Sequence, residues 1–308
     1  MKSALVTGLR GFAGKHLCRA LLDQGYTVQG IDRQGGATND VQVIQSDLTD
    51  VAELSGLLAD FQPDAIFHLA GSAFVPDSWE DPAATLDNNS LRTVNILQAA
   101  RKTGWKGRFL FVSSSDVYGR AADEEMPLRE TQPTRPDTPY ALSKLTAEEF
   151  ALFYLTDAID VVIARPFNHI GPGQSERFVV PAFLKRIRDA AAAGESTIPV
   201  GDIDSVRDFT DVRDVARAYV FLAESGQAGQ RYNVCSGRPV SIRQVFEGAC
   251  KVTGTAVSIR VEEALLRPEG PSARYGSNER LAALGWSAII PLEQSLADMW
   301  EELRGDST

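Results

Sequence analysis

Short apolar segments alternate with longer amphipathic segments along the first half of the chain, up to Arg165. The spacing predicts strands over Ser3–Thr7, Thr27–Ile31, Val41–Ser46, Ala65–Leu69, Arg108–Ser113 and Asp160–Arg165. It predicts helices over Lys15–Gln24, Ala52–Asp60, Thr85–Lys102 and Tyr140–Thr156. This alternation is typical of a parallel sheet covered on both faces. Such a sheet binds its ligand beyond the carboxyl ends of the strands, where the strand order reverses.

The alternation weakens after Arg165, where glycine and proline recur and the segments become shorter. Helices are still expected over Val179–Ala193, Val212–Glu224, Ile242–Thr253 and Leu292–Leu303. We therefore predict an α/β fold with two parts that share an interface. Residues 1–165 form a doubly wound parallel Rossmann sheet. Residues 166–308 form mainly a smaller C-terminal α+β lobe that binds substrate, with some strands and helices returning to the first part.

Charge and composition exclude several classes of protein. The formal net charge of −10 argues against a broad surface for nucleic acid or for an anionic membrane. The sequence has no apolar run long enough for a membrane span, and its start runs straight into a glycine turn instead of a signal-peptide core. Cys18, Cys235 and Cys250 lack the spacing of a metal site or a disulfide framework. We expect a cytoplasmic protein with reduced thiols and no metal.

Three glycines follow the first predicted strand at a spacing of three residues: Gly8, Gly11 and Gly14. Gly8 permits a tight turn, Gly11 lets the backbone approach a phosphate, and Gly14 lets the next helix pack close to the strand. A pyrophosphate would then lie at the N-terminus of that helix, where backbone N–H groups point outward. The segment predicts a dinucleotide site, with Arg10 and Phe12 in the same loop.

Acidic residues end the next two predicted strands. Asp32 has about the spacing expected for a partner of the ribose hydroxyls, and Asp47 and Leu48 lie where an adenine edge would sit. A carboxylate at position 32 repels a 2′-phosphate, so NAD(H) is favoured, although Arg10 and Arg33 could offset that repulsion and admit NADP(H). The candidate cofactor-binding residues are Gly8, Arg10, Gly11, Phe12, Gly14, Asp32, Arg33, Asp47, Leu48, Leu69, Ala70 and Lys144.

Tyr140 and Lys144 lie four residues apart on a predicted helix and therefore share a face. They come about 25 residues after a serine cluster at the end of the fifth strand, which contains Ser114. A free phenol ionises near pH 10, and a neighbouring ammonium lowers that value and makes the phenol a usable acid or base. We expect Tyr140 to exchange a proton, Lys144 to hold the nicotinamide ribose, and Ser114 to bind the substrate oxygen.

Four motifs together carry a resemblance to a known family. They are Gly8-x-x-Gly11-x-x-Gly14, His68-Leu69-Ala70-Gly71, Ser114 with Tyr140-x-x-x-Lys144, and Arg165-Pro166-Phe167-Asn168. With these motifs the chain resembles, over essentially its whole length, the extended short-chain dehydrogenase/reductases that act on nucleotide sugars. The resemblance implies an NAD(P)-dependent enzyme that forms a homodimer through the helices near residues 85–102 and 140–156.

The second half resembles GDP-6-deoxy-4-keto-D-mannose reductases, which make GDP-D-rhamnose. The motifs are Arg165–Gln174, Val206–Asp214, Tyr232–Gly237 and Leu266–Pro268. The match implies that Asn168 contacts the diphosphate, that Arg207 and Arg267 hold the nucleotide end, and that Val179 and Lys185 lie near the guanine. An acidic protein needs such fixed arginines to bind a diphosphate. A local ion pair for Arg207 and a solvated helix face for Lys185 remain open.

Asp116 bears on which reaction is catalysed. In the similar GDP-mannose 4,6-dehydratases a glutamate at this position removes the C5 proton, and aspartate reaches roughly 1.5 Å less far. This favours reduction of the C4 keto group of GDP-4-keto-6-deoxy-D-mannose, which needs no C5 base. The alternatives are a GDP-mannose 4,6-dehydratase, a nucleotide-sugar epimerase, or a non-catalytic dinucleotide sensor. Arg92 replaces a glycine of the family and is expected to alter helix packing but not the chemistry.

Overall fold

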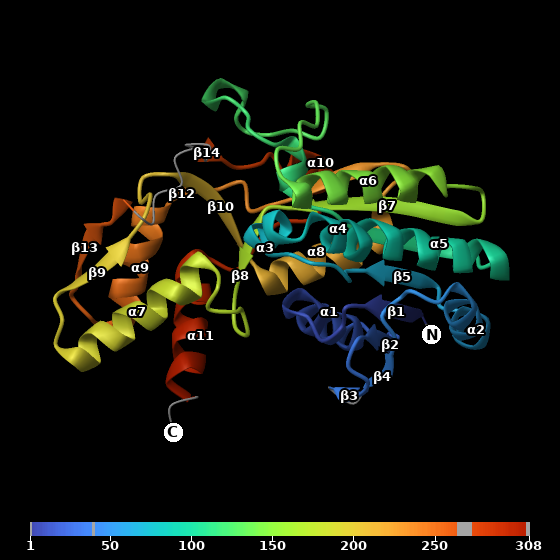
Figure 1. Ribbon diagram of the computed structural model, residues 1–308, viewed down its shortest axis with the longest axis horizontal. Coiled ribbons are helices and arrows are strands. Elements are labelled where there is room, and N and C mark those ends of the chain that lie inside the picture. Colours follow the sequence, from blue (N-terminus) through green and yellow to red (C-terminus); the bar gives the residue numbers. More distant parts are fainter. Residues whose placement is uncertain (1, 39–40, 264–272, 306–308) are drawn as a thin grey trace.

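The computed structural model describes residues 2–38, 41–263 and 273–305 (Figure 1). An eight-stranded sheet forms the centre of the larger part, in the order β11-β7-β6-β5-β1-β2-β4-β3. Its strands are β1 (Ser3–Thr7), β2 (Thr27–Asp32), β3 (Gly36–Thr38), β4 (Val41–Gln45), β5 (Ala65–His68), β6 (Gly107–Val112), β7 (Ile159–Pro166) and β11 (Arg231–Val234). The pairs are parallel except for β3 with β4. Since β1 pairs with both β2 and β5, the strand order reverses beside β1.

Helices cover both faces of this sheet. The covering helices are α1 (Phe12–Asp23) and α8 (Val212–Ser225) on one face, and α2 (Val51–Phe61), α5 (Arg92–Thr103) and α6 (Pro139–Phe153) on the other. Leu17 of α1 and Tyr219 of α8 are buried in one core with Phe67. Ile96 of α5 is buried in a second core with Phe109. The predicted parallel Rossmann sheet, wound on both faces, is confirmed.

The smaller part contains α7 (Val179–Ala193), α9 (Ile242–Thr253), α11 (Leu292–Gly305), β9 (Thr197–Val200) and β13 (Ser258–Val261) around a core of its own. A second sheet contains β8 (Asn168–Ile170), β10 (Val206–Asp211), β12 (Pro239–Ser241) and β14 (Ala273–Arg274). Short elements complete the described chain: α3 (Val75–Glu80), α10 (Glu279–Ala283), η2 (Ser115–Tyr118) and η3 (Asp123–Glu125). Helix α8 and strand β11 come after residue 165 in the sequence, but they belong to the larger part of the molecule. Residue 165 is therefore not a spatial boundary between the two parts.

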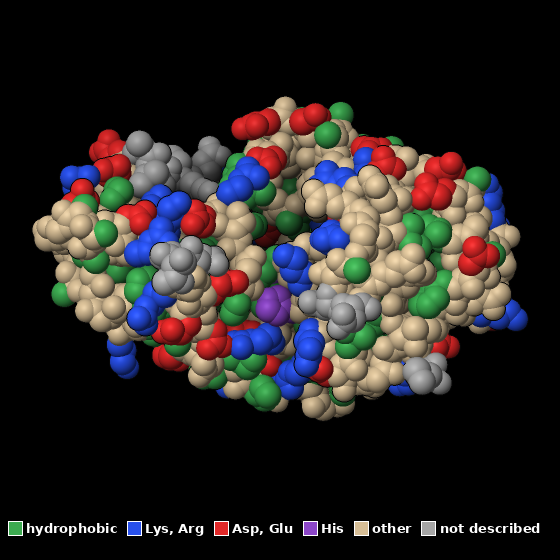
Figure 2. All heavy atoms as spheres, turned by 90° about the horizontal axis from the view of Figure 1, so that it is seen from below, with side chains coloured by type: hydrophobic (Ala, Val, Ile, Leu, Met, Phe, Trp, Pro, Cys, Tyr) green, Lys and Arg blue, Asp and Glu red, His purple; other side chains and the backbone are tan. Residues whose placement is uncertain are grey.

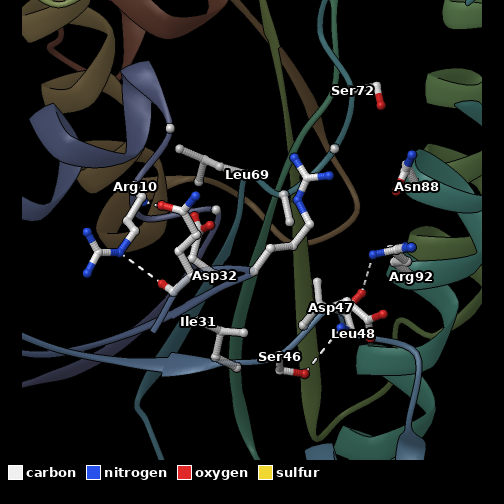
Figure 3. A pocket seen from close by; sticks show the side chains of 16 residues that line it. Arg10, Ile31, Asp32, Ser46, Asp47, Leu48, Leu69, Ser72, Asn88 and Arg92 are labelled. Atoms are coloured by element: carbon white, nitrogen blue, oxygen red, sulfur yellow. Dashed lines mark hydrogen bonds between the residues drawn. The ribbon is translucent and has the colours of Figure 1, made fainter. Parts of the chain in front are cut away.

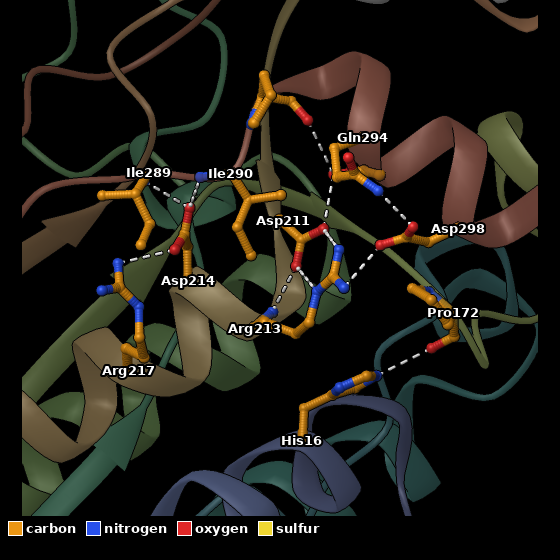
Figure 4. Close-up of polar contacts among 12 residues, drawn as sticks. His16, Pro172, Asp211, Arg213, Asp214, Arg217, Ile289, Ile290, Gln294 and Asp298 are labelled. Carbon is orange, nitrogen blue, oxygen red and sulfur yellow. Dashed lines mark hydrogen bonds and ion pairs between the residues drawn. The ribbon is translucent and has the colours of Figure 1, made fainter. Parts of the chain in front are cut away.

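Polar contacts fix the smaller part to α1 and α8 (Figure 4). Arg213 of α8 pairs with Asp211 at 2.8 Å and with Asp298 of α11 at 2.7 Å. The imidazole Nε2 of His16 on α1 lies 2.9 Å from the carbonyl oxygen of Pro172. In addition, the N–H groups of residues 289 and 290, just before α11, donate to the Asp214 carboxylate at 2.8 Å. The two parts therefore form one continuous body.

Two predicted helices differ from the observed ones. The helix expected over Thr85–Lys102 consists of α4 (Pro82–Leu86), a π-helical turn η1 (Asp87–Leu91) and α5. A π turn holds more residues than an α turn, and hydrophobic periodicity does not reveal it. The first helix begins at Phe12 and not at Lys15, and Gly14 lies in its first turn, close to the carbonyl oxygen of Gly8. No helix in the described part of the chain is long and apolar enough to cross a membrane.

Candidate active site

A cavity of about 380 Å³ opens at the carboxyl ends of β1, β2, β4 and β5 (Figure 3). It lies where the strand order reverses, as the sequence predicts for a ligand site. Its walls contain Gly8, Arg10, Gly11, Ile31, Asp32, Arg33, Gln34, Ser46, Asp47, Leu48, Leu69, Ala70, Gly71, Ser72, Asn88 and Arg92. Nine of the twelve candidate cofactor residues are in this set. Phe12, Gly14 and Lys144 are not.

The glycine turn is built so that no side chain fits at its tightest points. Gly8 has a φ of 70°, and a Cβ there would lie 2.9 Å from the backbone nitrogen of Ala70. A Cβ on Gly14 would lie 2.2 Å from the carbonyl oxygen of Gly8, so α1 packs directly on the turn. The Phe12 ring turns away and stacks on His169 at 5.8 Å between ring centroids. Gly14 and Phe12 thus shape the turn from outside the cavity, which remains open to a pyrophosphate along Gly8 and Gly11.

Asp32 and Arg10 connect the glycine turn to the loop after β2 (Figure 3). The backbone N–H of Arg10 donates to Asp32 Oδ2 at 3.0 Å, and the Arg10 guanidinium donates to the carbonyl oxygens of Gln34 and Gly35 at 2.9 and 2.8 Å. Arg10 is therefore occupied by backbone carbonyls, whereas Arg33 is an exposed cation in the cavity wall. Asp32 keeps its other oxygen for a ligand hydroxyl.

The opposite end of the cavity is formed by Asp47, Leu48 and a residue that sequence reasoning placed outside the site. Arg92 Nη1 donates to the Asp47 carbonyl oxygen at 2.5 Å, and its Nη2 lies 3.1 Å from Asp87 Oδ2. The π turn before Arg92 brings it into the cavity wall. The expectation that Arg92 affects helix packing alone is therefore incomplete. Hydrogen bonds from Thr49 lower the pKa of the Asp47 carboxyl, which keeps it charged.

Ser114, Tyr140 and Lys144 lie together at the carboxyl end of β6. The Ser114 hydroxyl lies close enough to the Tyr140 phenol to affect its pKa, and Lys144 Nζ donates to the carbonyl oxygen of Val112 at 2.9 Å. A Cβ on Gly71 would lie 3.5 Å from Lys144 Nζ, so the ammonium lies directly behind a residue of the cavity wall. The structure thus places the predicted proton-transfer group beside the predicted dinucleotide cavity.

Burial sets the ionisation of this cluster. Desolvation lowers the pKa of Lys144 to about 8, although the nearby Glu148 carboxylate opposes that shift. Desolvation and then the charge of Asp116 raise the pKa of Tyr140 above its usual value, and the Ser114 hydroxyl opposes them. The expectation that a neighbouring ammonium lowers this pKa is therefore wrong, because burial outweighs it. At neutral pH the phenol is therefore protonated and able to donate a proton to a developing alkoxide.

Asp116, the remaining catalytic candidate, is bound in an ion pair. Its Oδ1 lies 2.5 Å from Nη1 of Arg274, a residue of β14. Nη2 of the same guanidinium donates to the carbonyl oxygen of Gly119 at 3.1 Å. Sequence reasoning gave no role to Arg274, which lies 158 positions from Asp116 along the chain. In this structure the Asp116 carboxylate is engaged by a cation.

The candidate substrate residues lie on the smaller part. Asn168 is exposed on β8, next to β10, which carries the half-buried Arg207. Arg207 Nη1 donates to the carbonyl oxygen of Val206 at 2.8 Å. The two acidic residues considered as its ion-pair partners have other contacts, since Asp208 accepts hydrogen bonds from the N–H groups of residues 236 and 237 and Asp211 pairs with Arg213.

The other substrate candidates are less directly placed. Val179 begins α7, and Lys185 on the same helix pairs with Glu176 at 2.5 Å in an exposed position. In this structure Lys185 is therefore part of a solvent-exposed ion pair. Arg267 lies outside the described residues. Figure 2 shows a hollow between the two parts of the molecule, with Lys and Arg side chains around its rim.

Comparison with known proteins connects this geometry to a family. The NAD dependent epimerase/dehydratase family matches residues 4–235. This chain belongs to that family. It is 40% identical over 295 residues to the GDP-6-deoxy-D-mannose reductase of Pseudomonas aeruginosa, covering 94% of this chain and 93% of the relative. It is 28% identical to a GDP-mannose 4,6-dehydratase of Yersinia enterocolitica, covering 97% and 93%.

Solved structures agree with this assignment. The structure of RMD from Pseudomonas aeruginosa complexed with NADPH has a TM-score of 0.87 and 37% identity, covering 99% of this chain and 100% of that one. UDP-glucose 4-epimerase of Thermus thermophilus in complex with NAD has a TM-score of 0.86 and 28% identity, covering 98% and 99%. The family and fold predicted from the motifs are confirmed, and the cofactor class, a nicotinamide dinucleotide, is supported.

Proposed function

We propose that this protein reduces the C4 keto group of GDP-4-keto-6-deoxy-D-mannose with NAD(P)H and forms GDP-D-rhamnose. The observation that carries the proposal is the neighbouring pair of Ser114 and Tyr140 hydroxyls, with Lys144 directly behind Gly71 of the cavity wall. The 40% identity to a GDP-6-deoxy-D-mannose reductase over 94% of the chain supports the choice of substrate.

The protein groups have separate tasks in this reaction. A bound dihydronicotinamide supplies the hydride for C4. Ser114 donates a hydrogen bond to O4 and fixes its position, and Tyr140 transfers its phenolic proton to O4 as negative charge develops there. The Lys144 ammonium stabilises the phenolate that this transfer leaves behind. Ser114 follows β6, and Lys144 bonds to the last residue of that strand, so these groups lie at the carboxyl edge of the sheet.

The substrate diphosphate would bind on the smaller part. Asn168 and Arg207 are carried by adjacent strands, and Arg267 is proposed to join them. Arginine binds phosphate oxygens in pairs, and the basic rim in Figure 2 supplies such cations in a chain of net charge −10. Val179 and Lys185 are proposed to contact the base. Binding would release Lys185 from Glu176.

A 4,6-dehydratase is the second candidate, supported by the relatives of that name. That reaction needs a base at C5. The candidate for this base, Asp116, is ion-paired with Arg274 and is one methylene shorter than glutamate. The reductase is therefore favoured.

Incubating the enzyme with the GDP-linked keto sugar and either NADPH or NADH tests the proposal. We expect loss of the nicotinamide absorbance and a product that nuclear magnetic resonance identifies as GDP-D-rhamnose. GDP-mannose serves as the matched control and should consume no cofactor. The proposal fails if neither cofactor is consumed with the keto sugar, and conversion of GDP-mannose to the keto sugar would identify a dehydratase instead.

We propose that the cavity accepts both cofactors. Asp32 favours the ribose hydroxyls of NADH, as the sequence indicates, whereas the exposed Arg33 can pair with the 2′-phosphate of NADPH. The NADPH bound to the Pseudomonas aeruginosa neighbour supports the second use. The free thiols of Cys18, Cys235 and Cys250 fit the reducing cytoplasm in which we place the reaction.

A homodimer is also proposed, through the outer faces of α4, η1 and α6. Large apolar side chains are exposed along these elements: Leu86, Leu91, Leu142, Phe150 and Phe153. Leu142 is 54% exposed and Phe153 is 76% exposed, which is unusual for apolar residues unless another surface covers them. A second copy presenting the same face would bury this set.

The reduction rate should fall as the pH rises above about 8, in a single step that reflects Lys144. Burial lowers the pKa of Lys144, so its charge is present below that value and is lost above it. Without the ammonium, the phenolate of Tyr140 is less stabilised and proton donation slows. A kcat profile between pH 6 and about pH 10 measures the step. A flat profile across this range would contradict the role given to Lys144.

A further inference from the structure

The Asp116 carboxylate lies among the groups that would hold the substrate carbonyl. Its backbone N–H donates to the Ser114 hydroxyl at 3.1 Å, and its charge acts on the Tyr140 phenol. Ser114 and Tyr140 are the groups that bind O4 in the proposed reaction. Asp116 therefore lies beside both members of the proposed proton-transfer pair.

A carboxylate beside a bound ketone has a chemical consequence. Hydrogens on the carbons next to a carbonyl are acidic. A carboxylate that takes the C5 proton becomes a carboxylic acid, and the electron pair of the C5–H bond forms the C4–C5 double bond of an enolate. Donors to O4 stabilise that enolate. The Ser114–Tyr140 pair that promotes reduction would therefore also promote enolisation, unless the base is prevented from acting.

Arg274 engages this carboxylate from the other part of the molecule. Nη1 lies 2.5 Å from Asp116 Oδ1, and Nη2 donates to the Gly119 carbonyl oxygen, so both ends of the guanidinium are fixed on η2 and the residue after it. The Arg274 side chain is 15% exposed and the Asp116 side chain 23%, so water screens the pair only partly.

The backbone around Arg274 is also held. Strand β14 pairs in parallel with β10, with Arg274 opposite Arg207. On its other side, the N–H of Leu128 donates to the Tyr275 carbonyl oxygen, and the N–H of Ser277 donates to the Leu128 carbonyl oxygen. The guanidinium therefore projects from a segment that is anchored on both sides, as a group that positions another side chain requires.

We propose that Arg274 is a specificity-determining positioning residue that holds the Asp116 carboxylate in an ion pair and so prevents it from removing the C5 proton of the bound keto sugar. The proposal rests on the function proposed above. It adds to the short reach of Asp116 a second restriction, which the sequence does not show. The site would then reduce its ketone without enolising it.

Deuterium exchange at C5 tests this proposal. The enzyme, oxidised cofactor and keto sugar are incubated in D₂O, where no hydride is available, and nuclear magnetic resonance measures the enzyme-dependent loss of the C5 hydrogen signal. We expect little exchange with the wild type and about tenfold or more with Arg274→Met, since a freed general base contributes about 10²-fold or more. Arg274→Lys, which retains the charge, should behave like the wild type. Asp116→Asn/Arg274→Met should return exchange to the wild-type rate.

The outcomes separate the possibilities. Two results would overturn the proposal. In the first, Arg274→Met exchanges deuterium no faster than Asp116→Asn/Arg274→Met. In the second, the wild type exchanges deuterium as fast as Arg274→Met. Arg274→Gln, which keeps a donor for Gly119, replaces the methionine variant if the latter fails to bind NADPH. Reduction by the wild type with NADPH is measured in parallel. If the wild type does not reduce the keto sugar, the proposed function is wrong. The ratio of deuterium exchange between Arg274→Met and the wild type tests the role of Arg274.

Discussion

Replacing Tyr140 with phenylalanine is expected to lower kcat for reduction by about 10²–10⁴-fold, the usual contribution of a general acid. The phenol is the proposed proton donor beside Ser114 and Lys144, and it is buried, so water cannot easily take its place. The affinity for NADPH should change little, because the cavity walls do not include Tyr140. Steady-state kinetics and a fluorescence titration of bound NADPH measure the two quantities separately.

Tyr154→Phe is the matched control, since Tyr154 lies at the end of the same helix and loses the same hydroxyl. It should retain wild-type kcat. A Tyr140→Phe enzyme that keeps more than about a tenth of wild-type kcat would show that another group donates the proton. If NADPH binding is lost together with kcat, thermal unfolding of the variant shows whether the fold was lost with the hydroxyl.

Replacing Glu148 with methionine is expected to reduce the free energy of unfolding by about 3–5 kcal/mol, which is the cost of leaving a buried charge unpaired. Glu148 and Arg165 form an ion pair at 2.7 Å in which the side chains are 0% and 2% exposed. The guanidinium also lies over the Tyr118 ring at 4.9 Å. Since arginine stays protonated, removal of Glu148 leaves its charge in the core. Urea unfolding of the variant and the wild type measures the difference in the free energy of unfolding, and the loss of activity is followed in the same urea series.

Two variants show whether burial causes the loss. Asp23→Met breaks the exposed Arg19–Asp23 pair, at 2.9 Å, and should cost about 0.5 kcal/mol or less. Glu148→Met/Arg165→Met replaces both charges with apolar side chains and should recover most of the stability. Equal losses for the buried and the exposed pair would show that the Glu148–Arg165 pair contributes no more than a surface contact.

The parts of the fold that follow from local pattern were predicted from sequence. Strands such as Ser3–Thr7 and helices such as Val179–Ala193 have strong periodicity and clear boundaries, and the structure has them over the same residues. The π turn at Asp87–Leu91 was not predicted, since it depends on contacts such as the hydrogen bond between Asn89 Nδ2 and Ser143 Oγ at 2.9 Å. Such contacts join segments that are distant in sequence.

Some residues of the candidate site could also be predicted from the sequence, and others could not. Gly8, Asp32 and Asp47 follow strands that end at one edge of the sheet, so their proximity in the cavity could be deduced from topology. Arg92 and Arg274 could not be found by this reasoning. Arg92 reaches the cavity through a π turn, and Arg274 reaches Asp116 across the two parts of the molecule. Contacts between segments that are distant in sequence leave no periodic signal.

Helix α8 and strand β11 complete the larger part of the molecule although they come late in the sequence. This order affects how the chain folds while it is being synthesised on the ribosome. Until residue 234 has been synthesised, β7 has an unpaired outer edge, and the apolar face of α1 lacks its partner helix. Open strand edges and uncovered apolar faces are where nascent chains associate with one another or with chaperones. The eight-stranded sheet is therefore complete only after about half of residues 166–308 has emerged, so its folding depends on the second part of the chain.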